Sequence, residues 1–290
     1  MRKTLIISIA LCLISVPPIF GQTGLDLLTV EAGARPSGMG GAFTAVVQDP
    51  YSAGYNPAAA FGIGPLAASI GHNTYWENIR IETGYLSFQK KSITFSAGVQ
   101  FAVDGNLQGR GLTPTSDYTA FDAHDISFKT GVSFEVDKDV VFGFMLGWMF
   151  EKIENFHGSA FNADIGLLTR PMTDLNVGFA VLNLGQKMKI REEEYKLPTA
   201  FRAGVSYRFA RFLPAADIVI QDDDFHLHLG GEYKVSSSLF LRTGYRFGYD
   251  TKDFSAGAGF ARRNLRIDYA FLPYKDNLWD SHLINLTFQL

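Results

Sequence analysis

Two histidines have the spacing in this chain that comes closest to a metal site. His226 and His228 are two residues apart, so on a strand they share one face, and three aspartates at 222–224 precede them. The alternative, which we favour, is a surface turn followed by histidines in the lumen or at the rim of a barrel. The other four histidines show no cluster spacing: His72, His124, His157 and His282. We therefore predict no metal site.

A glycine-rich run, Gly38-Met39-Gly40-Gly41, resembles a phosphate-binding loop. It lacks the Lys-Ser/Thr pair and the preceding strand that such a loop needs, so close packing explains the glycines better. No serine lies in a G-x-S-x-G elbow, and the sole cysteine, Cys12, lies in an N-terminal apolar segment. The acidic run at 192–194 is interpreted as part of a solvated loop. We expect no enzymatic activity and no cofactor.

The N-terminus has the organisation of a secretory signal peptide. A positive stretch at 1–3 is followed by an apolar region at 5–16 and a small residue, Gly21. A lipoprotein signal using Cys12 is the alternative, but Leu11 stands where a small residue is needed. After cleavage near Gly21 the chain has no cysteine, and no later apolar run is long enough for a spanning helix. The mature chain is then periplasmic, secreted or an outer-membrane barrel.

Composition favours a β-rich membrane protein over a nucleic-acid-binding one. The 290-residue chain has a net charge of −3 and 19% charged residues, which gives no bulk basic character. Aromatic residues make up 14%, a proportion that suits strands with an apolar outer surface. Residues after 63 alternate with period two. Near the C-terminus, Ile284, Leu286 and Phe288 point one way, and Asn285 and Thr287 the other.

About fourteen segments have roughly the 9–11 residues that a tilted strand needs to cross a bilayer, and the count is even, as in bacterial outer-membrane barrels. Most even-numbered connections are short turns, whereas the long connections, 105–121 and 185–197, are odd-numbered. This asymmetry favours an all-β, transmembrane antiparallel barrel over a soluble sandwich. The segments lie at 66–72, 78–89, 92–104, 122–135, 140–153, 158–170, 174–184, 198–209, 211–221, 224–234, 238–248, 252–262, 264–273 and 280–290.

Charged residues on the polar faces of these segments are expected to face the lumen, since on the lipid side each would be strongly unfavourable. In a soluble sheet they would form an ordinary solvated face. The predicted lumen residues are Arg202, Arg208, Arg242, Arg246, Arg266 and Asp268.

Residues 33–60 do not alternate. They are rich in glycine and alanine and too irregular for a long helix or strand, and Asn56-Pro57-Ala58 favours a turn. We predict a signal peptide at 1–21, an N-terminal plug at 22–63 inside the lumen and an outer-membrane β-barrel at 64–290. Removal of the plug is expected to make the membrane leaky to small solutes.

Several motifs resemble the PorV/PorQ family. They are G-A-R-P-S-G-M-G-G-A-F-T-A-V at 33–46, D-P-Y-S-A-G-Y-N-P-A at 49–58, and the downstream stretches 181–185, 228–233, 241–245 and 268–271. That family belongs to the superfamily of long-chain fatty-acid transport barrels, which have fourteen strands and an N-terminal plug, and Asn56-Pro57-Ala58 resembles its NPA motif. The resemblance implies an outer-membrane component of type IX secretion in Bacteroidetes-type bacteria.

Three functional hypotheses follow. In the first, the barrel is a partner in type IX protein secretion or surface attachment, binding secretion-system proteins or secreted cargo through its rim and exterior loops. The alternative is transport of a hydrophobic, fatty-acid-like small molecule, which needs an apolar lumen pocket. The third is a purely structural barrel. Outer-membrane lipid is a partner in each case, and nucleic acid in none.

Four glycines permit strand kinks or make room for the plug: Gly98, Gly131, Gly143 and Gly147.

Overall fold

The computed structural model describes residues 26–75, 79–110, 118–275 and 279–290, so the predicted signal peptide lies outside the described residues. The described helices are η1 (Asp26–Thr29), α2 (Ala34–Gly38), α3 (Ser52–Tyr55) and η2 (Pro57–Ala60). The strands are β1 (Ala67–Thr74), β2 (Arg80–Lys90), β3 (Ile93–Arg110), β4 (Tyr118–Asp137), β5 (Val140–Ile153), β6 (Phe156–Met172), β7 (Leu175–Gly185), β8 (Met188–Ile190), β9 (Glu193–Tyr195), β10 (Ala200–Tyr207), β11 (Phe212–Gln221), β12 (Asp224–Lys234), β13 (Leu239–Phe247), β14 (Phe254–Arg262), β15 (Leu265–Leu272) and β16 (Ser281–Gln289).

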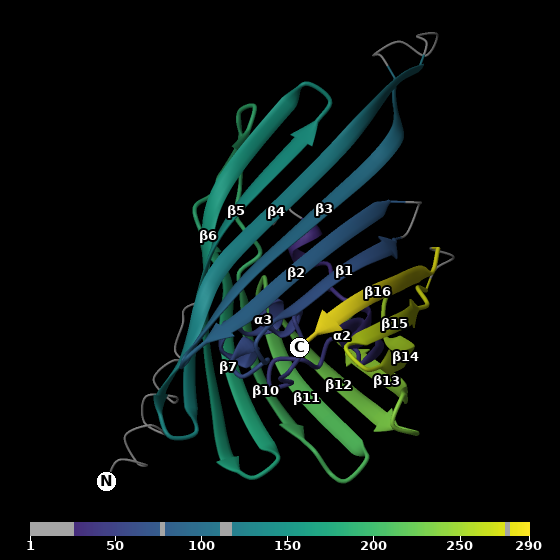
Figure 1. Ribbon diagram of the computed structural model, residues 1–290. Coiled ribbons are helices and arrows are strands. Elements are labelled where there is room, and N and C mark those ends of the chain that lie inside the picture. Colours follow the sequence, from purple (N-terminus) through teal and green to yellow (C-terminus); the bar gives the residue numbers. More distant parts are fainter. Residues whose placement is uncertain (1–25, 76–78, 111–117, 276–278) are drawn as a thin grey trace.

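Fourteen of these strands form a closed antiparallel barrel (Figure 1), which confirms the predicted fold class and strand number. Neighbours in the barrel follow the chain order, except that β10 pairs with β7 because β8 and β9 form a separate hairpin. The first and last strands close the barrel, with Ala67 opposite Gln289. Each of the fourteen predicted segments overlaps one barrel strand, because period-two alternation marks every one of them.

The outer face of the barrel is apolar and its inner face is largely polar. On β16, Ile284, Leu286 and Phe288 are 51%, 44% and 37% exposed, whereas Asn285 and Thr287 are buried. A soluble sheet buries its apolar face, so this inversion fits a barrel that is surrounded by lipid and filled inside. No helix in the described ranges is long and apolar enough to cross a membrane.

The barrel wall is taller on one side. Strands β3 to β6 have 14 to 20 residues, whereas β10 to β16 have 8 to 11. The loop predicted at 105–121 is therefore too long, because β3 continues to Arg110 and β4 begins at Tyr118. Pairing of β3 with β4 resumes beyond a register shift between Asp104 and Leu107 and continues to Arg110, opposite Tyr118. Because of this irregularity, a strict alternation pattern does not predict that the two strands continue to pair.

The two ends of the barrel differ. The turn end carries the short turns, such as those after β2, β12 and β14, and the C-terminus; the loop end carries the longer connections. The predicted exterior loop 185–197 is only partly a loop, because β8 and β9 pair within it. Met188 is fully buried and Ile190 is 9% exposed, so the hairpin packs inward with these two side chains. The acidic residues of β9 remain exposed.

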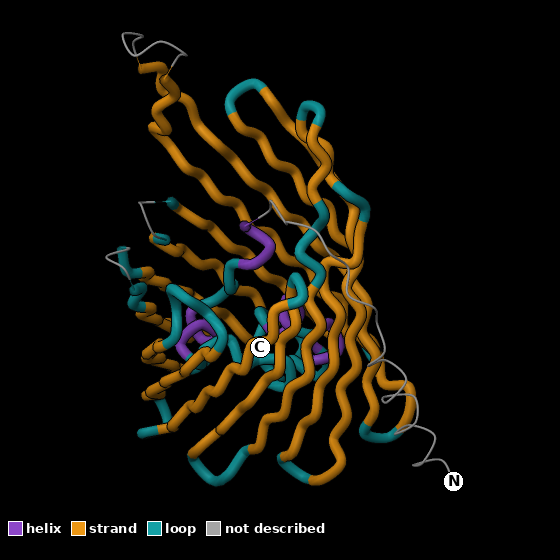
Figure 2. Tube along the Cα trace, turned by 180° about the vertical axis from the view of Figure 1, so that it is seen from behind, coloured by secondary structure: helices purple, strands orange, loops and turns teal. Residues whose placement is uncertain are grey.

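Residues 27–63, which we call the N-terminal segment, lie inside the barrel (Figure 2). Every residue from 32 to 46 is buried, polar ones included. Its helices have only four or five residues, and Gly40 and Gly41 turn the chain with φ angles of +66° and +69°, which glycine adopts without strain. That this segment is a plug which blocks the pore stays a prediction.

Candidate functional site

Three arginines and three carboxylates form a closed ring of ion pairs where the N-terminal segment meets the barrel wall. We call it the ion-pair ring. Two members come from the segment and four from β12, β13 and β15. The N–O distances are 3.2 Å for Arg35–Asp49, 2.8 Å for Arg35–Glu232, 2.7 Å for Arg242–Glu232, 2.9 Å for Arg242–Asp268 and 2.6 Å for Arg266–Asp268, and Arg266 closes the ring on Asp49.

All side chains of the ion-pair ring are at most 16% exposed. Buried charges are tolerated only when they are paired, and breaking such a pair leaves an uncompensated charge. Burial is the largest influence on Asp49 and raises its pKa, but the charges of Arg266 and Arg35 outweigh it and the pKa is lowered. Burial lowers the pKa of Arg35, but Glu232 and Asp49 raise it above its usual range. The ring therefore holds both residues of the segment in their charged forms.

A second anchor joins the N-terminal segment to β10 and β11. One carboxylate oxygen of Asp217, Oδ2, accepts hydrogen bonds from the backbone N–H groups of Phe43 and Thr44, both at 2.9 Å, and from the Thr44 hydroxyl at 2.6 Å. Arg202 pairs with the same oxygen at 2.9 Å and donates to the Gly41 carbonyl at 2.7 Å. Arg202 thus faces the lumen as predicted, and its partners belong to the segment.

A third anchor lies toward the loop end. Arg246 donates from Nε to Glu31 at 2.8 Å and from Nη2 to the Ser37 carbonyl at 3.2 Å. Burial is the largest influence on Glu31 and raises its pKa, but the Arg246 charge and its hydrogen bonds outweigh it and lower the pKa from 4.5 to about 2. His228 lies beside this pair, 2.9 Å from the Tyr249 hydroxyl, and the His226 ring stacks on Tyr249.

The two histidines thus lie inside the lumen rather than in an open turn. Within the described ranges no three or more His, Cys, Asp or Glu side chains come together in a way that could hold a metal ion.

The glycine-rich run lets the segment approach the wall closely. Gly38 packs on the backbone of Gly257, and a Cβ on Gly40 would lie 3.1 Å from Gly244. The Gly40 N–H donates to the Ser255 hydroxyl at 3.1 Å, and Met39 is fully buried in an apolar cluster with Phe43, Tyr55 and Leu213. Gly41, the last residue of the run, lies against Glu31 and His228. These contacts favour the packing interpretation of the run.

Asn56-Pro57-Ala58 forms the start of helix η2. The Asn56 side chain accepts from the Ala58 N–H at 3.0 Å, which caps the helix, while Pro57 occupies the first turn, where no N–H is needed. The Asn56 amide also donates to the Leu167 carbonyl of β6 at 3.1 Å. A Cβ on Gly143 would overlap the backbone of Pro57 and Ala58, so this glycine makes room for the segment.

Arg208 stands apart from the other predicted lumen residues. It follows the end of β10, is exposed, and lines a cavity of about 220 Å³ at the turn end. Arg35, Glu232, Arg242 and Arg266 of the ion-pair ring line the same cavity. The turn end therefore has a polar space beneath the ring that is large enough for several waters, since a single water needs only about 10–15 Å³.

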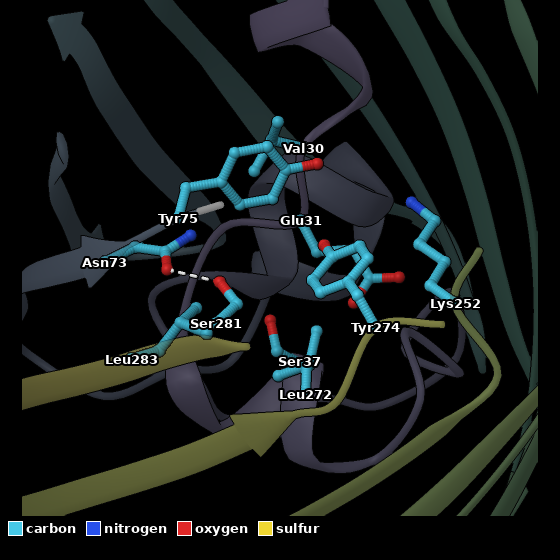
Figure 3. Close-up of a pocket in the computed structure, with 10 residues that line it drawn as sticks. All are labelled: Val30, Glu31, Ser37, Asn73, Tyr75, Lys252, Leu272, Tyr274, Ser281 and Leu283. Carbon is cyan, nitrogen blue, oxygen red and sulfur yellow. Dashed lines mark hydrogen bonds between the residues drawn. The ribbon is translucent and has the colours of Figure 1, made fainter. Parts of the chain in front are cut away.

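The loop end has a much smaller cavity, about 10 Å³, between the N-terminal segment and the β1–β16 seam (Figure 3). The Ser281 hydroxyl donates to Asn73 Oδ1 at 2.8 Å across the seam. The rings of Tyr75 and Tyr274 meet edge to face, with centroids 5.9 Å apart. The space suffices for about one water, so the seam is closed at this end.

Apolar side chains fill the lumen beside η1 at the loop end. Strands β2, β3, β5 and β6, helix η1 and the β8–β9 hairpin all contribute. Met188 and Ile190 of the hairpin cover the group from the loop side, and Met149 is fully buried beneath them. We call it the loop-end apolar cluster: Leu27, Ile81, Ala102, Met149, Ala160, Met188, Ile190 and Leu197.

Sequence reasoning missed several of the charged residues that pair inside the lumen. Glu232 and Asp217 carry the same signal as the predicted arginines, a charge at a lumen-facing position of a strand. Lys129 and Asp164 form another interior pair at 2.6 Å. Arg35 and Asp49 carried no such signal, because the N-terminal segment has no regular period from which to read a direction.

No protein-family model matches the sequence, and no curated protein matches it. Solved structures do match. The P. putida toluene transporter TodX superposes with a TM-score of 0.67 at 12% identity, over 89% of this chain and 98% of that one. The CymD monoaromatic hydrocarbon channel gives 0.65 at 12% identity, over 92% and 99%. A Pseudomonas aeruginosa FadL homologue gives 0.60 at 13% identity, over 94% and 100%.

The chain has the fold of these channels. The likeness covers almost the whole of each of them and supports the predicted relation to fatty-acid-transporter-like barrels at the level of fold. The closed barrel and its apolar outer face fit the predicted place in a membrane.

Proposed function

We propose that this protein admits small hydrophobic molecules across the outer membrane, with the N-terminal segment as the element that closes the lumen. Its partners in this proposal are outer-membrane lipid and a hydrophobic small molecule. This was the alternative hypothesis from the sequence, and the fold supports it better than a role in protein secretion.

The loop-end apolar cluster is the observation that carries the proposal. A water-filled pore has a polar lining, whereas here four strands turn apolar residues inward at the loop end. Burying apolar surface of a solute there is favourable by about 25 cal/mol per Å². Met188 and Ile190 occupy the position that such a solute would take, so the hairpin must shift to admit it.

The names of the similar structures add support. TodX is described as a toluene transporter, and CymD as a monoaromatic hydrocarbon channel. The identity of about 12% shows a common fold, and the substrate of this chain is therefore proposed from its own apolar cluster.

The type IX secretion hypothesis rests on the motif resemblance to the PorV/PorQ family. The comparisons give it no support, and it stays a prediction. Comparing the secreted proteome of a deletion strain with that of the parent tests it directly. An unchanged secreted proteome together with lost uptake of a hydrophobic solute would exclude it in favour of transport.

Uptake by the purified protein tests the transport proposal. We expect proteoliposomes containing the full mature chain to take up radiolabelled toluene faster than empty liposomes. Met188→Glu places a charge in the apolar cluster and should abolish the increase. Lys189→Glu is the matched control, because this neighbouring side chain is exposed on the same hairpin. Both variants must show the heat-modifiable gel mobility of a folded barrel. Equal uptake with and without the protein, or equal uptake by the two variants, would contradict the proposal.

A further inference from the structure

The turn-end cavity is lined by more arginines than carboxylates. Four arginines, Arg35, Arg208, Arg242 and Arg266, face it together with one carboxylate, Glu232. The remaining carboxylates of the ion-pair ring, Asp49 and Asp268, bind Arg35, Arg242 and Arg266 from outside this lining.

Once these pairs are made, the three arginines and three carboxylates of the ring balance one another, and the arginine in the lining that is left over is Arg208. The exposed Arg208 side chain makes no ion pair or hydrogen bond within the part of the chain that is described. Arg242 is only 5% exposed, and its Nη2 has no hydrogen-bond partner among the described residues. Because this nitrogen is itself buried, the guanidinium that faces the cavity with free N–H donors is that of Arg208.

The rest of the lining offers neutral polar and apolar surface. Gln48 and Gln289 carry amide N–H₂ groups, although that of Gln289 donates to the Ile63 carbonyl at 2.7 Å, and Val47 and Phe240 complete the wall. Guanidinium groups suit carboxylate and phosphate oxygens because two parallel N–H donors match two oxygens. The volume of about 220 Å³ accommodates a small anion together with several waters.

We propose that this cavity is a binding site for a small oxyanion, a carboxylate or a phosphate group, held between Arg208 and the ion-pair ring. The site lies at the opposite end of the lumen from the loop-end apolar cluster, and binding there does not depend on transport of hydrophobic molecules. The anion balances the charge of Arg208, which has no carboxylate partner among the described residues. It is either a free solute or the headgroup of an amphiphile whose tail lies along Val47 and Phe240.

Calorimetric titration of the purified full mature chain in neutral detergent tests the site. The probes are inorganic phosphate, acetate and hexanoate at constant ionic strength, with chloride as the competing salt. We expect saturable binding of phosphate and acetate, which Arg208→Gln weakens by about tenfold or more, as loss of a charged hydrogen-bond donor does. Gln48→Glu should weaken binding too, because it places a negative charge in the lining of the same cavity. Tighter binding of hexanoate than of acetate would identify an amphiphile headgroup, and equal binding a free solute.

Arg211→Gln is the matched control. This arginine lies on the same turn between β10 and β11, is exposed and does not line the cavity. Its variant should bind like the unaltered protein. Absence of saturable binding to the unaltered chain, or equal affinities for Arg208→Gln and Arg211→Gln, would overturn the proposal. Because the three substituted side chains are exposed and lie outside the ion-pair ring, gel mobility is expected to show folded barrels throughout.

Discussion

At its turn end the lumen is closed by ion pairs between the N-terminal segment and the wall, whereas at its loop end it is closed by apolar packing. The ion-pair ring joins Arg35 and Asp49 of the N-terminal segment to the wall, above a cavity of about 220 Å³. At the other end Met188 and Ile190 fold onto Leu27. Removing one partner of a buried ion pair leaves an uncompensated charge, so such pairs hold the segment in one position. Apolar contacts are non-directional, so another apolar surface can replace them. The loop end is therefore suited to admit a hydrophobic solute and the turn end to hold the segment.

Deleting residues 27–63 removes both closures at once and should have the largest effect. Four ring members belong to the wall and stay paired through Glu232–Arg242, Arg242–Asp268 and Arg266–Asp268, so the barrel is expected to remain folded. Liposome swelling with small sugars should rise from near zero to a rate typical of an open pore. Swelling that stays at the level of the full chain would show that something other than the segment closes the lumen.

Arg242→Met breaks the turn-end closure alone. It leaves Glu232 and Asp268 each with one partner, and loss of one member of a buried pair destabilises by about 3–5 kcal/mol. We expect a lower midpoint of heat-induced loss of gel mobility and a partial sugar leak. Arg263→Met, on an exposed turn, controls for the change of residue type. An unchanged midpoint and no leak would mean that the ring contributes little to holding the segment.

Met188→Ala weakens the loop-end closure. The side chain is fully buried, and truncations of this kind destabilise by about 2–5 kcal/mol at most sites. Since the ring remains intact, we expect faster protease cleavage within 185–197 without a sugar leak. A leak as large as that of Arg242→Met would remove the distinction between the two ends.

Acid should act on the third anchor and produce the smallest change. The folded-state pKa of Glu31, about 2, is below its ordinary value of 4.5, so its pairing with Arg246 stabilises fully above pH 4.5. That contribution is lost as the pH falls from 4.5 towards 2. The protection of amides near Glu31 against hydrogen exchange, taken relative to the intrinsic exchange rate at each pH, should fall over this interval. Glu31→Gln should remove this fall and lower the protection at neutral pH. Protection that falls equally with pH in Glu31→Gln would assign the effect to other carboxylates.

The strands and the direction of their side chains were predictable because both follow from a two-residue period. That period placed Arg202, Arg242, Arg246 and Arg266 on the lumen side, and the structure finds all four there. Arg208 was placed with them but follows the end of its strand, where the period no longer determines direction.

The partners were not predictable. Arg35 and Glu232 are 197 residues apart, and only closure of the barrel brings them together. The inward fold of Met188 and Ile190 was missed because three-residue strands are too short to show a period. The motif resemblance pointed first to secretion, but motifs do not tell which side chains line the lumen. The loop-end apolar cluster, which supports transport, became apparent only from the folded chain.

The contacts of the N-terminal segment also bear on how the protein is assembled. Its partners Asp217, Glu232, Arg246 and Arg266 lie on strands that are translated long after it, and the Ala34 N–H donates to Asn285 on the final strand at 2.5 Å. The segment also contacts earlier strands, as Asn56 does at Leu167, but its charged anchors are complete only once the last third of the chain has been threaded. Complete docking of the segment and sealing of the seam therefore depend on the same final strand.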